Sequence, residues 1–156
     1  MLPQICRDHT MPLQSAAIPY RYDADGELEI LLVTSRKKRR WVLPKGHVRL
    51  GMGAHASAAK EAFEEGGVIG RTEVEPITNY VRKKRNASDE EEHSVTVHPM
   101  AVTTEASVWP EMLQRERRWA TISDALSLVE QDGMRKAIAA FDRAFSPVCA
   151  KPMGRL

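Results

Sequence analysis

Apolar residues gather in short runs separated by polar turns, a pattern that predicts strands on both sides of a helical segment. Residues 15–22 and 28–34 are strand-like, and Asp23-Ala24-Asp25-Gly26 between them is a hairpin turn signal. Further strands are predicted at Trp41-Val42-Leu43, 73–83, 94–104 and 118–121. The polar connection from Asn86 to Glu92 is expected to be a mobile loop.

Three segments have the spacing and the end signals of helices. Pro44-Lys45-Gly46 breaks regular structure, and a helix is predicted to begin near residues 54–56 and to end at Gly66-Gly67. Ser123 resembles an N-cap for a helix over 124–131, and Met134 to Phe145 forms the last helix. The element order predicts a mixed α/β domain with helices on a largely non-parallel sheet.

The length of 156 residues suits one domain, which we expect to span 1–156 with a core at about 15–145. Cys6 and Cys149 form neither a disulfide framework nor a CxxC metal site, in keeping with a reducing cytoplasm. The first residues lack an apolar signal region, and no stretch has the roughly 20 apolar residues that cross a bilayer. We therefore expect a soluble cytoplasmic protein with no membrane partner.

The net charge of +2 says little about partners, but the charges are clustered. Basic runs occupy residues 36–40 and 82–85, and an acidic run occupies 89–92. Any one such run by itself is typical of a solvated turn.

The predicted central helix carries the candidate chemistry. At 100° per residue, Ala59, Ala62, Phe63 and Gly66 are predicted to share the docking face, with the acidic residues on the opposite, open face. The acidic residues are three carboxylates within one turn and a half: Glu61, Glu64 and Glu65. Such a cluster repels itself unless a cation lies among the carboxylates, and Mg²⁺ prefers carboxylate oxygens together with substrate phosphates. A solvent-facing acidic stripe is the alternative reading of an isolated cluster of this kind.

The helix and the loop before it resemble the signature of the Nudix hydrolase family, Gly-x5-Glu-x7-Arg-Glu-U-x-Glu-Glu-x-Gly-U, in which U is apolar. The corresponding residues here are Gly46, Met52, Lys60, Glu61, Ala62, Glu64, Glu65, Gly67 and Val68. The spacing is kept throughout, and seven of the nine specified positions agree. The resemblance implies the family's α/β/α sandwich with a mixed sheet.

The resemblance also implies a metal-dependent hydrolase. Glu61, Glu64 and Glu65, helped by the backbone carbonyl near Gly46, are expected to bind Mg²⁺ or Mn²⁺, while water attacks a phosphorus of a diphosphate. A general base often comes from the helix or from a later loop, and Glu116 is the favoured candidate. Glu111 and Glu105 are the next candidates. An ordinary loop ion pair with Arg115 or Arg117 is the alternative role for Glu116.

Two positions depart from the family pattern. Met52 stands where the family has Glu, and a thioether does not replace a carboxylate. Lys60 stands where the family has a catalytic-helix Arg, and lysine keeps the charge without the planar fork. These departures predict weaker activity, a changed metal requirement or loss of activity.

The sequence around the box is similar to two branches of the family. Trp41 to Val48 resembles the box entry of dinucleoside polyphosphate and diphosphoinositol polyphosphate hydrolases, and Glu116 to Trp119 resembles the second group. If the basic runs border the pocket, they hold the non-reacting phosphates. The expected substrate-binding residues are Arg36, Lys38, Arg40, Lys45, His47, Arg82 and Lys84.

Other functions fit the sequence less well. The histidines show no zinc-ligand spacing, and no P-loop motif is present. Trp41, Trp109 and Trp119 are read as core or pocket-wall residues, and nucleic acid is an unlikely partner. The serious alternative is a weakened Nudix-fold module that binds a polyphosphate, nucleotide or RNA without hydrolysis. The exact substrate and the oligomeric state stay open.

Overall fold

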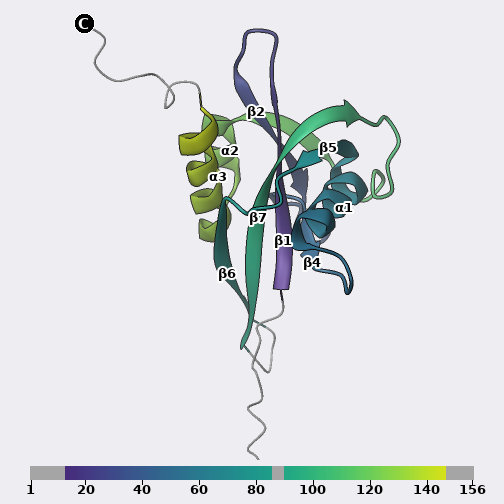
Figure 1. Ribbon diagram of the computed structural model, residues 1–156, viewed down its shortest axis with the longest axis vertical. Helices are drawn as coiled ribbons and strands as arrows, with labels where there is room; N and C mark the ends of the chain where they lie inside the picture. Colours follow the sequence, from purple (N-terminus) through teal and green to yellow (C-terminus); the bar gives the residue numbers. More distant parts are fainter. Residues whose placement is uncertain (1–12, 86–89, 147–156) are drawn as a thin grey trace, which may run out of the picture.

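The computed structural model describes residues 13–85 and 90–146, with only the backbone at residues 84, 85, 90 and 91. Eight strands and three helices are found in this part of the chain (Figure 1). In chain order they are β1 (Leu13–Tyr22), β2 (Leu28–Thr34), β3 (Trp41–Val42), β4 (Lys45–His47), α1 (Ala54–Gly66), β5 (Val68–Thr72), β6 (Thr78–Arg85), β7 (Glu90–Glu105), β8 (Arg117–Thr121), α2 (Ile122–Leu128) and α3 (Asp132–Phe145).

The strands form one mixed sheet in which β3, β2, β1, β7 and β5 are successive neighbours. β1 and β7 are parallel, whereas the other pairs are antiparallel, including β4 with β1, β6 with β7 and β8 with β2. Helix α1 covers one face, and α2 and α3 lie on the opposite side (Figure 1). The predicted α/β/α sandwich with a mixed sheet is confirmed.

Two hydrophobic cores arise because successive strand side chains point to opposite faces. Ala17 of β1 packs in the core beneath α1 with Ala58 and Ala62 of that helix. The next residue, Ile18, belongs to the larger core on the other face, where Phe141 of α3 is fully buried. The sheet thus holds α1 on a face of its own.

Two short strands were missed by the sequence pattern. Lys45–His47 was predicted as a break but pairs with β1 through Ser15 and Gly46. It can do so because β2 pairs only with the later residues of β1, which leaves the earlier backbone groups on that side available. Val68–Thr72 pairs with β7 and contains Gly70, where an added Cβ would lie 2.0 Å from the carbonyl oxygen of Ala101. Neither segment has apolar alternation, so only pairing with a neighbour makes it a strand.

Several predicted boundaries moved. The strand predicted at 73–83 lies at Thr78–Arg85, and the strand predicted at 94–104 begins earlier, at Glu90. Residues 90–92 of the predicted mobile loop are therefore paired with β6, for example Lys83 with Glu92, whereas residues 86–89 lie outside the described residues. Cross-strand pairing of opposite charges stabilises this extension of the hairpin.

The helix ends also differ from the prediction. The N-cap of α2 is Thr121, whose hydroxyl accepts from the Asp124 backbone N–H at 3.1 Å, so Ser123 lies inside the helix. The helix ends at Leu128, and α3 begins at Asp132. The short strand at Trp41 ends one residue earlier than predicted. The predicted end of α1 is confirmed, since Gly67 is its left-handed C-cap with φ of 67°.

Among the described residues, no helix combines the length and apolar character needed to cross a membrane. Cys6 and Cys149 lie outside the described residues. The single-domain organisation over 1–156 stays a prediction.

Candidate metal and phosphate site

Helix α1 presents its carboxylates differently from the prediction. The buried stripe contains Ala58, Ala62 and, one turn further on, the adjacent residues Glu65 and Gly66. Glu65 is thus buried, with only 5% of its surface exposed, although it was predicted on the open face. Phe63, predicted on the docking face, is 36% exposed. The predicted docking face is correct for Ala62 and Gly66, which are buried, and wrong for Phe63 and Glu65, because the packed stripe is centred between the alanines and Glu65.

The loop glycine of the motif lies directly against the helix. A Cβ added to Gly46 would lie 2.4 Å from both Cδ and Oε1 of Glu61, so only glycine leaves room for this carboxylate. The preceding residue contacts the same helix, since the Lys45 backbone N–H donates to Glu65 Oε2 at 3.3 Å. Strand β4 thereby places the backbone of Lys45 and Gly46 against the carboxylates of Glu65 and Glu61.

A buried ion pair joins Glu65 to the segment between β7 and β8. Arg115 Nη2 lies 3.3 Å from Glu65 Oε1, and Arg115 Nε donates to Glu111 Oε1 at 3.0 Å. Arg115 also donates from Nη1 to the Thr34 carbonyl at 2.9 Å. Burial raises the pKa of Glu65 to about 8, while Arg115 acts in the opposite direction and the charges of Glu61 and Glu111 add to the rise.

The other two carboxylates are more accessible. Glu64 Oε1 lies 3.6 Å from Lys60 Nζ, one helical turn earlier, and 3.8 Å from Arg49 Nη2. Burial, followed by the neighbouring charge of Glu64, raises the pKa of Glu61. Glu111 contributes to that rise as well, so four carboxylates from two segments act on one another here.

The donor set suits a hard divalent cation. It consists of carboxylate oxygens beside backbone. The pKa values of Glu61 and Glu65 are raised first by burial and then by neighbouring carboxylates, and a bound cation would offset both effects. In the described part of the chain, no three Asp, Glu, His or Cys side chains already surround one point closely enough to hold a metal. Lys60 pairs with Glu64 Oε1 and Arg115 pairs with Glu65 Oε1, so a metal would share these carboxylates with the two cations.

A basic cavity adjoins the carboxylates. A cavity of about 1030 Å³ lies between the β2–β3 turn and β6, and four of the predicted substrate-binding residues line it together with Lys37, Lys83 and Gln131. These four are Arg36, Lys38, Arg40 and Arg82. A smaller cavity of about 170 Å³ shares Arg36, Arg82 and Gln131 with it and also reaches Lys45, Glu65 and Arg115. The two basic runs, 42 or more residues apart, therefore converge beside the buried acid.

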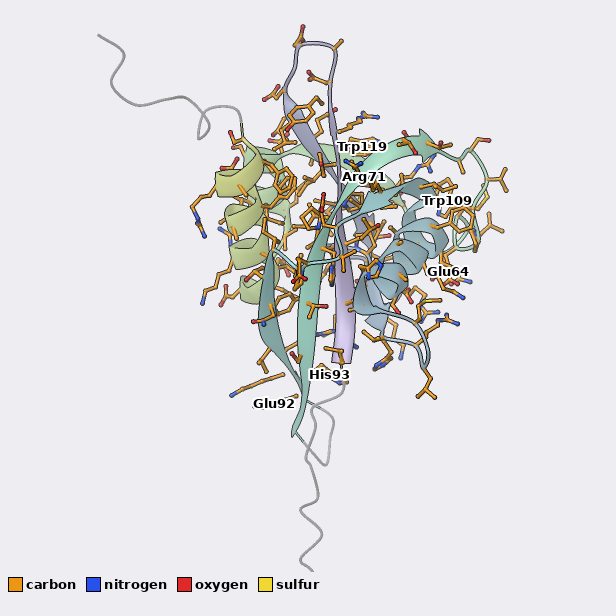
Figure 2. All side chains as sticks on the ribbon, viewed as in Figure 1. Glu64, Arg71, Glu92, His93, Trp109 and Trp119 are labelled. Atoms are coloured by element: carbon orange, nitrogen blue, oxygen red, sulfur yellow. The ribbon has the colours of Figure 1, made fainter. Side chains whose placement is uncertain are left out.

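Other predicted site residues lie elsewhere. His47 is exposed on β4, with its ring centroid 5.7 Å from that of His93, and it lines neither basic cavity. Figure 2 shows His93 at the end of β7 remote from the labelled Glu64. The Lys84 side chain lies outside the described residues. Glu116 is exposed, and its backbone pairs with Thr34 at the start of β8.

Arg115 and Gln131 are site residues that the sequence did not single out. Arg115 was considered only as an ion-pair partner of Glu116, and Glu111 only as a reserve candidate. The sequence signal for Glu111 and Arg115 was their spacing of four residues, which predicts an ion pair between them on one helical turn. This spacing gives no indication of their contact with α1. Gln131 carries no sequence signal, and it borders the cavities only through the link between α2 and α3.

Comparison with known proteins gives consistent matches. A family model described as the NUDIX domain matches residues 11–141. The chain is 33% identical over 127 residues to Nudix hydrolase 21, chloroplastic, of Arabidopsis thaliana, a match of 80% of this chain and 63% of that protein. The chain thus spans less than two thirds of this relative. Because the name of this relative contains the word chloroplastic, the match does not support a cytoplasmic location, which stays a prediction.

A second relative and a solved structure are also similar to this chain. The diphosphoinositol polyphosphate phosphohydrolase 3-beta of Bos taurus is 24% identical over 119 residues, 75% of this chain and 68% of that protein. The structure of a C. elegans Ap4A hydrolase binary complex has a TM-score of 0.67 at 17% identity and covers 87% of this chain and 98% of that chain. At this identity the structural likeness concerns the fold alone.

Proposed function

The chain belongs to the NUDIX domain family, and on that premise we propose that it is a Mg²⁺-dependent pyrophosphohydrolase that cleaves a diphosphate linkage by attack of water on phosphorus. The observation that carries the proposal is the smaller cavity, whose wall contains both Glu65 of the acidic helix and the basic residues Arg36 and Arg82. An anionic substrate in the basic cavity would place a phosphate beside the carboxylates. Mn²⁺ is the alternative metal.

We assign the metal to Glu61, Glu64 and Glu65 with the backbone at Gly46. A divalent cation bound there would supply charge neutralisation of the diphosphate and a more acidic water. Lys60 holds Glu64 by an ion pair at 3.6 Å, so its role is to orient that carboxylate. The Gly46 position keeps the Glu61 carboxylate against the loop backbone.

The proton of the attacking water requires an acceptor that is not fully engaged by the metal. Glu111 is the loop carboxylate that acts on both Glu61 and Glu65, and Arg115 orients it at 3.0 Å. Its position supports Glu111 as the base, whereas Glu116, the residue favoured from the sequence, is exposed and stays the second candidate.

The size and charge of the basic cavity support a substrate with several phosphates, either a dinucleoside polyphosphate, an inositol pyrophosphate or a nucleoside diphosphate derivative. Arginines bind phosphate oxygens in pairs, and Lys38 adds a point charge. We propose that Arg36, Arg40 and Arg82 hold the phosphates that do not react. Lys45 lines the smaller cavity, and its ammonium donates to Gln14 Oε1 at 3.2 Å.

The rival function is binding without hydrolysis, and Met52 is the observation behind it. Met52 is half-buried before α1, where the family has a carboxylate. Lys60, the second departure, keeps a positive charge 3.6 Å from Glu64 within the motif.

The test offers dinucleoside polyphosphates, inositol pyrophosphates, nucleoside triphosphates and nucleotide sugars to the full chain with Mg²⁺ or Mn²⁺, with products resolved by chromatography. Glu64→Gln should lower kcat by at least about 100-fold, since one metal ligand is removed, and Glu27→Gln, an exposed turn residue, is the matched control. Equal activity of Glu64→Gln and the parent would refute the metal assignment. Tight binding of these compounds with no metal-dependent product would establish the binding module instead.

A further inference from the structure

The C-terminal end of α1 is closed by another part of the chain. Helix ends leave their last carbonyls without partners inside the helix. The C-cap at Gly67 donates to the carbonyls of Ala62 and Phe63. The following carbonyls need other donors, and the β7–β8 loop (residues 106–116) together with Arg117 supplies them.

Three of these bonds reach successive residues of the metal-site helix. The Glu111 backbone N–H donates to the Glu64 carbonyl at 3.0 Å, and the Trp109 indole Nε1 donates to the Glu65 carbonyl at 3.1 Å. Arg117 Nη1 donates to the Gly66 carbonyl at 3.1 Å. The loop that carries Glu111 is therefore hydrogen-bonded to the residues that carry the site carboxylates.

Trp109 and Arg117 form a stacked pair at this junction. The Arg117 guanidinium carbon lies 3.8 Å from the centre of the Trp109 ring, and Arg117 Nε is held by Glu105 Oε1 at 3.3 Å. A Cβ added to Gly67 would lie 2.7 Å from Arg117 Nη1 and 2.8 Å from Trp109 Cγ, so the pair packs on bare backbone. Figure 2 shows Trp109 beside the end of α1, on the side where Glu64 projects.

We propose that Trp109 and Arg117 are positioning residues that fix the β7–β8 loop to the C-terminal end of α1 and thereby set the Glu111 carboxylate beside the metal-site carboxylates. The proposal rests on the proposed function for the meaning of that site. Trp109 acts through Glu111 and does not itself touch substrate. Trp109→Phe tests this role, because it removes the indole N–H that bonds to the Glu65 carbonyl and keeps an aromatic ring.

Trp119 supplies a matched control. Its indole Nε1 donates to Glu105 Oε2 at 3.2 Å, and the Arg21 guanidinium stacks on its ring at 4.0 Å. Trp109→Phe and Trp119→Phe each remove one indole N–H and keep an aromatic ring under an arginine. Only the first removes a bond to α1.

Two measurements need no enzymatic activity. Hydrogen exchange of the full chain should show the Glu111 amide opening about fivefold more often in Trp109→Phe than in the parent, the change expected for one lost hydrogen bond. Mn²⁺ affinity, followed by electron paramagnetic resonance, should weaken by a similar factor. Trp119→Phe should change both by less than about twofold. Equal changes in the two variants would overturn the proposal.

Coupling to Glu111 separates positioning from a merely structural role. In a Glu111→Gln background, Trp109→Phe should cause no further loss of Mn²⁺ affinity, because the carboxylate it positions is gone. With an active substrate, Trp109→Phe should lower kcat and leave KM nearly unchanged. Additive losses would overturn the proposal. Failure of the parent to hydrolyse any diphosphate would refute the proposed function. Hydrogen exchange at the Glu111 amide and Mn²⁺ affinity in the single and double variants would still decide whether Trp109 positions Glu111.

Discussion

Glu65 makes the stability of the metal-free chain depend on pH in an unusual direction. Its folded pKa is about 8, compared with an ordinary value of 4.5, and the main cause is burial. Between these pH values the folded chain keeps a proton that the unfolded chain has released, so raising the pH favours unfolding. The stabilisation of the folded chain by the proton on Glu65 is fully present below pH 4.5 and is lost as the pH rises through about 8.

The magnitude follows from the size of the shift. One pKa unit corresponds to about 1.4 kcal/mol, so the rise from 4.5 to about 8 makes Glu65 lower the free energy of unfolding by about 4 to 5 kcal/mol across the window. Glu65→Gln mimics the protonated side chain and does not titrate. Its free energy of unfolding relative to the parent should therefore increase by about 3 to 4 kcal/mol from pH 5 to pH 8, which is the larger part of that amount.

The assay is urea unfolding followed by tryptophan fluorescence at pH 5, 6, 7 and 8 with a chelator present. Glu116→Gln, which makes the same chemical change at an exposed side chain, is the control. Saturating Mg²⁺ should reduce the pH dependence in the parent, since a cation stabilises the carboxylate. A difference between Glu65→Gln and the parent that does not change from pH 5 to 8 would refute the reasoning.

Three further predictions concern backbone space and a buried histidine. Gly46→Ala should lower kcat at least about tenfold with a small change in Tm, because its Cβ displaces the Glu61 carboxylate; unchanged kinetics would contradict that contact. Gly67→Ala should lower the free energy of unfolding by more than about 1 kcal/mol, since φ is 67° and the Cβ meets Arg117, and chemical denaturation measures it. Burial lowers the pKa of His98 below 6.5, so unfolding should become easier as the pH falls below about 6.5, where only the unfolded chain gains the proton. His98→Gln should show less of this acid sensitivity in thermal melts, and identical acid profiles would exclude His98 as its source.

Sequence reasoning succeeded where a local pattern determines structure. The apolar runs in residues 15–22 and 28–34, with a turn signal between them, predicted β1 and β2, and the paired glycines predicted the end of α1. The family membership read from the Gly46-to-Val68 motif is confirmed by the family match. These features depend on residues close together in the chain, so their spacing carries the information.

The site needed information that spacing does not contain. Helical periodicity placed Glu65 on an open face, but the helix docks by its Ala58, Ala62 and Glu65 stripe, and Arg115 lies 3.3 Å from the buried Glu65 carboxyl. Likewise, β4 and β5 exist because a neighbouring strand offers unpaired backbone groups, which no local residue pattern reports.

By itself, the sequence determined the sandwich, the family and the helix that carries the three glutamates. Only the tertiary structure decided which glutamate is buried, which loop carboxylate joins the others, and that residues 36–38, 40, 82 and 83 face one cavity. The physical reason is distance along the chain. Burial, charge coupling and cavity walls are made by segments tens of residues apart, and these meet only after the sheet has formed.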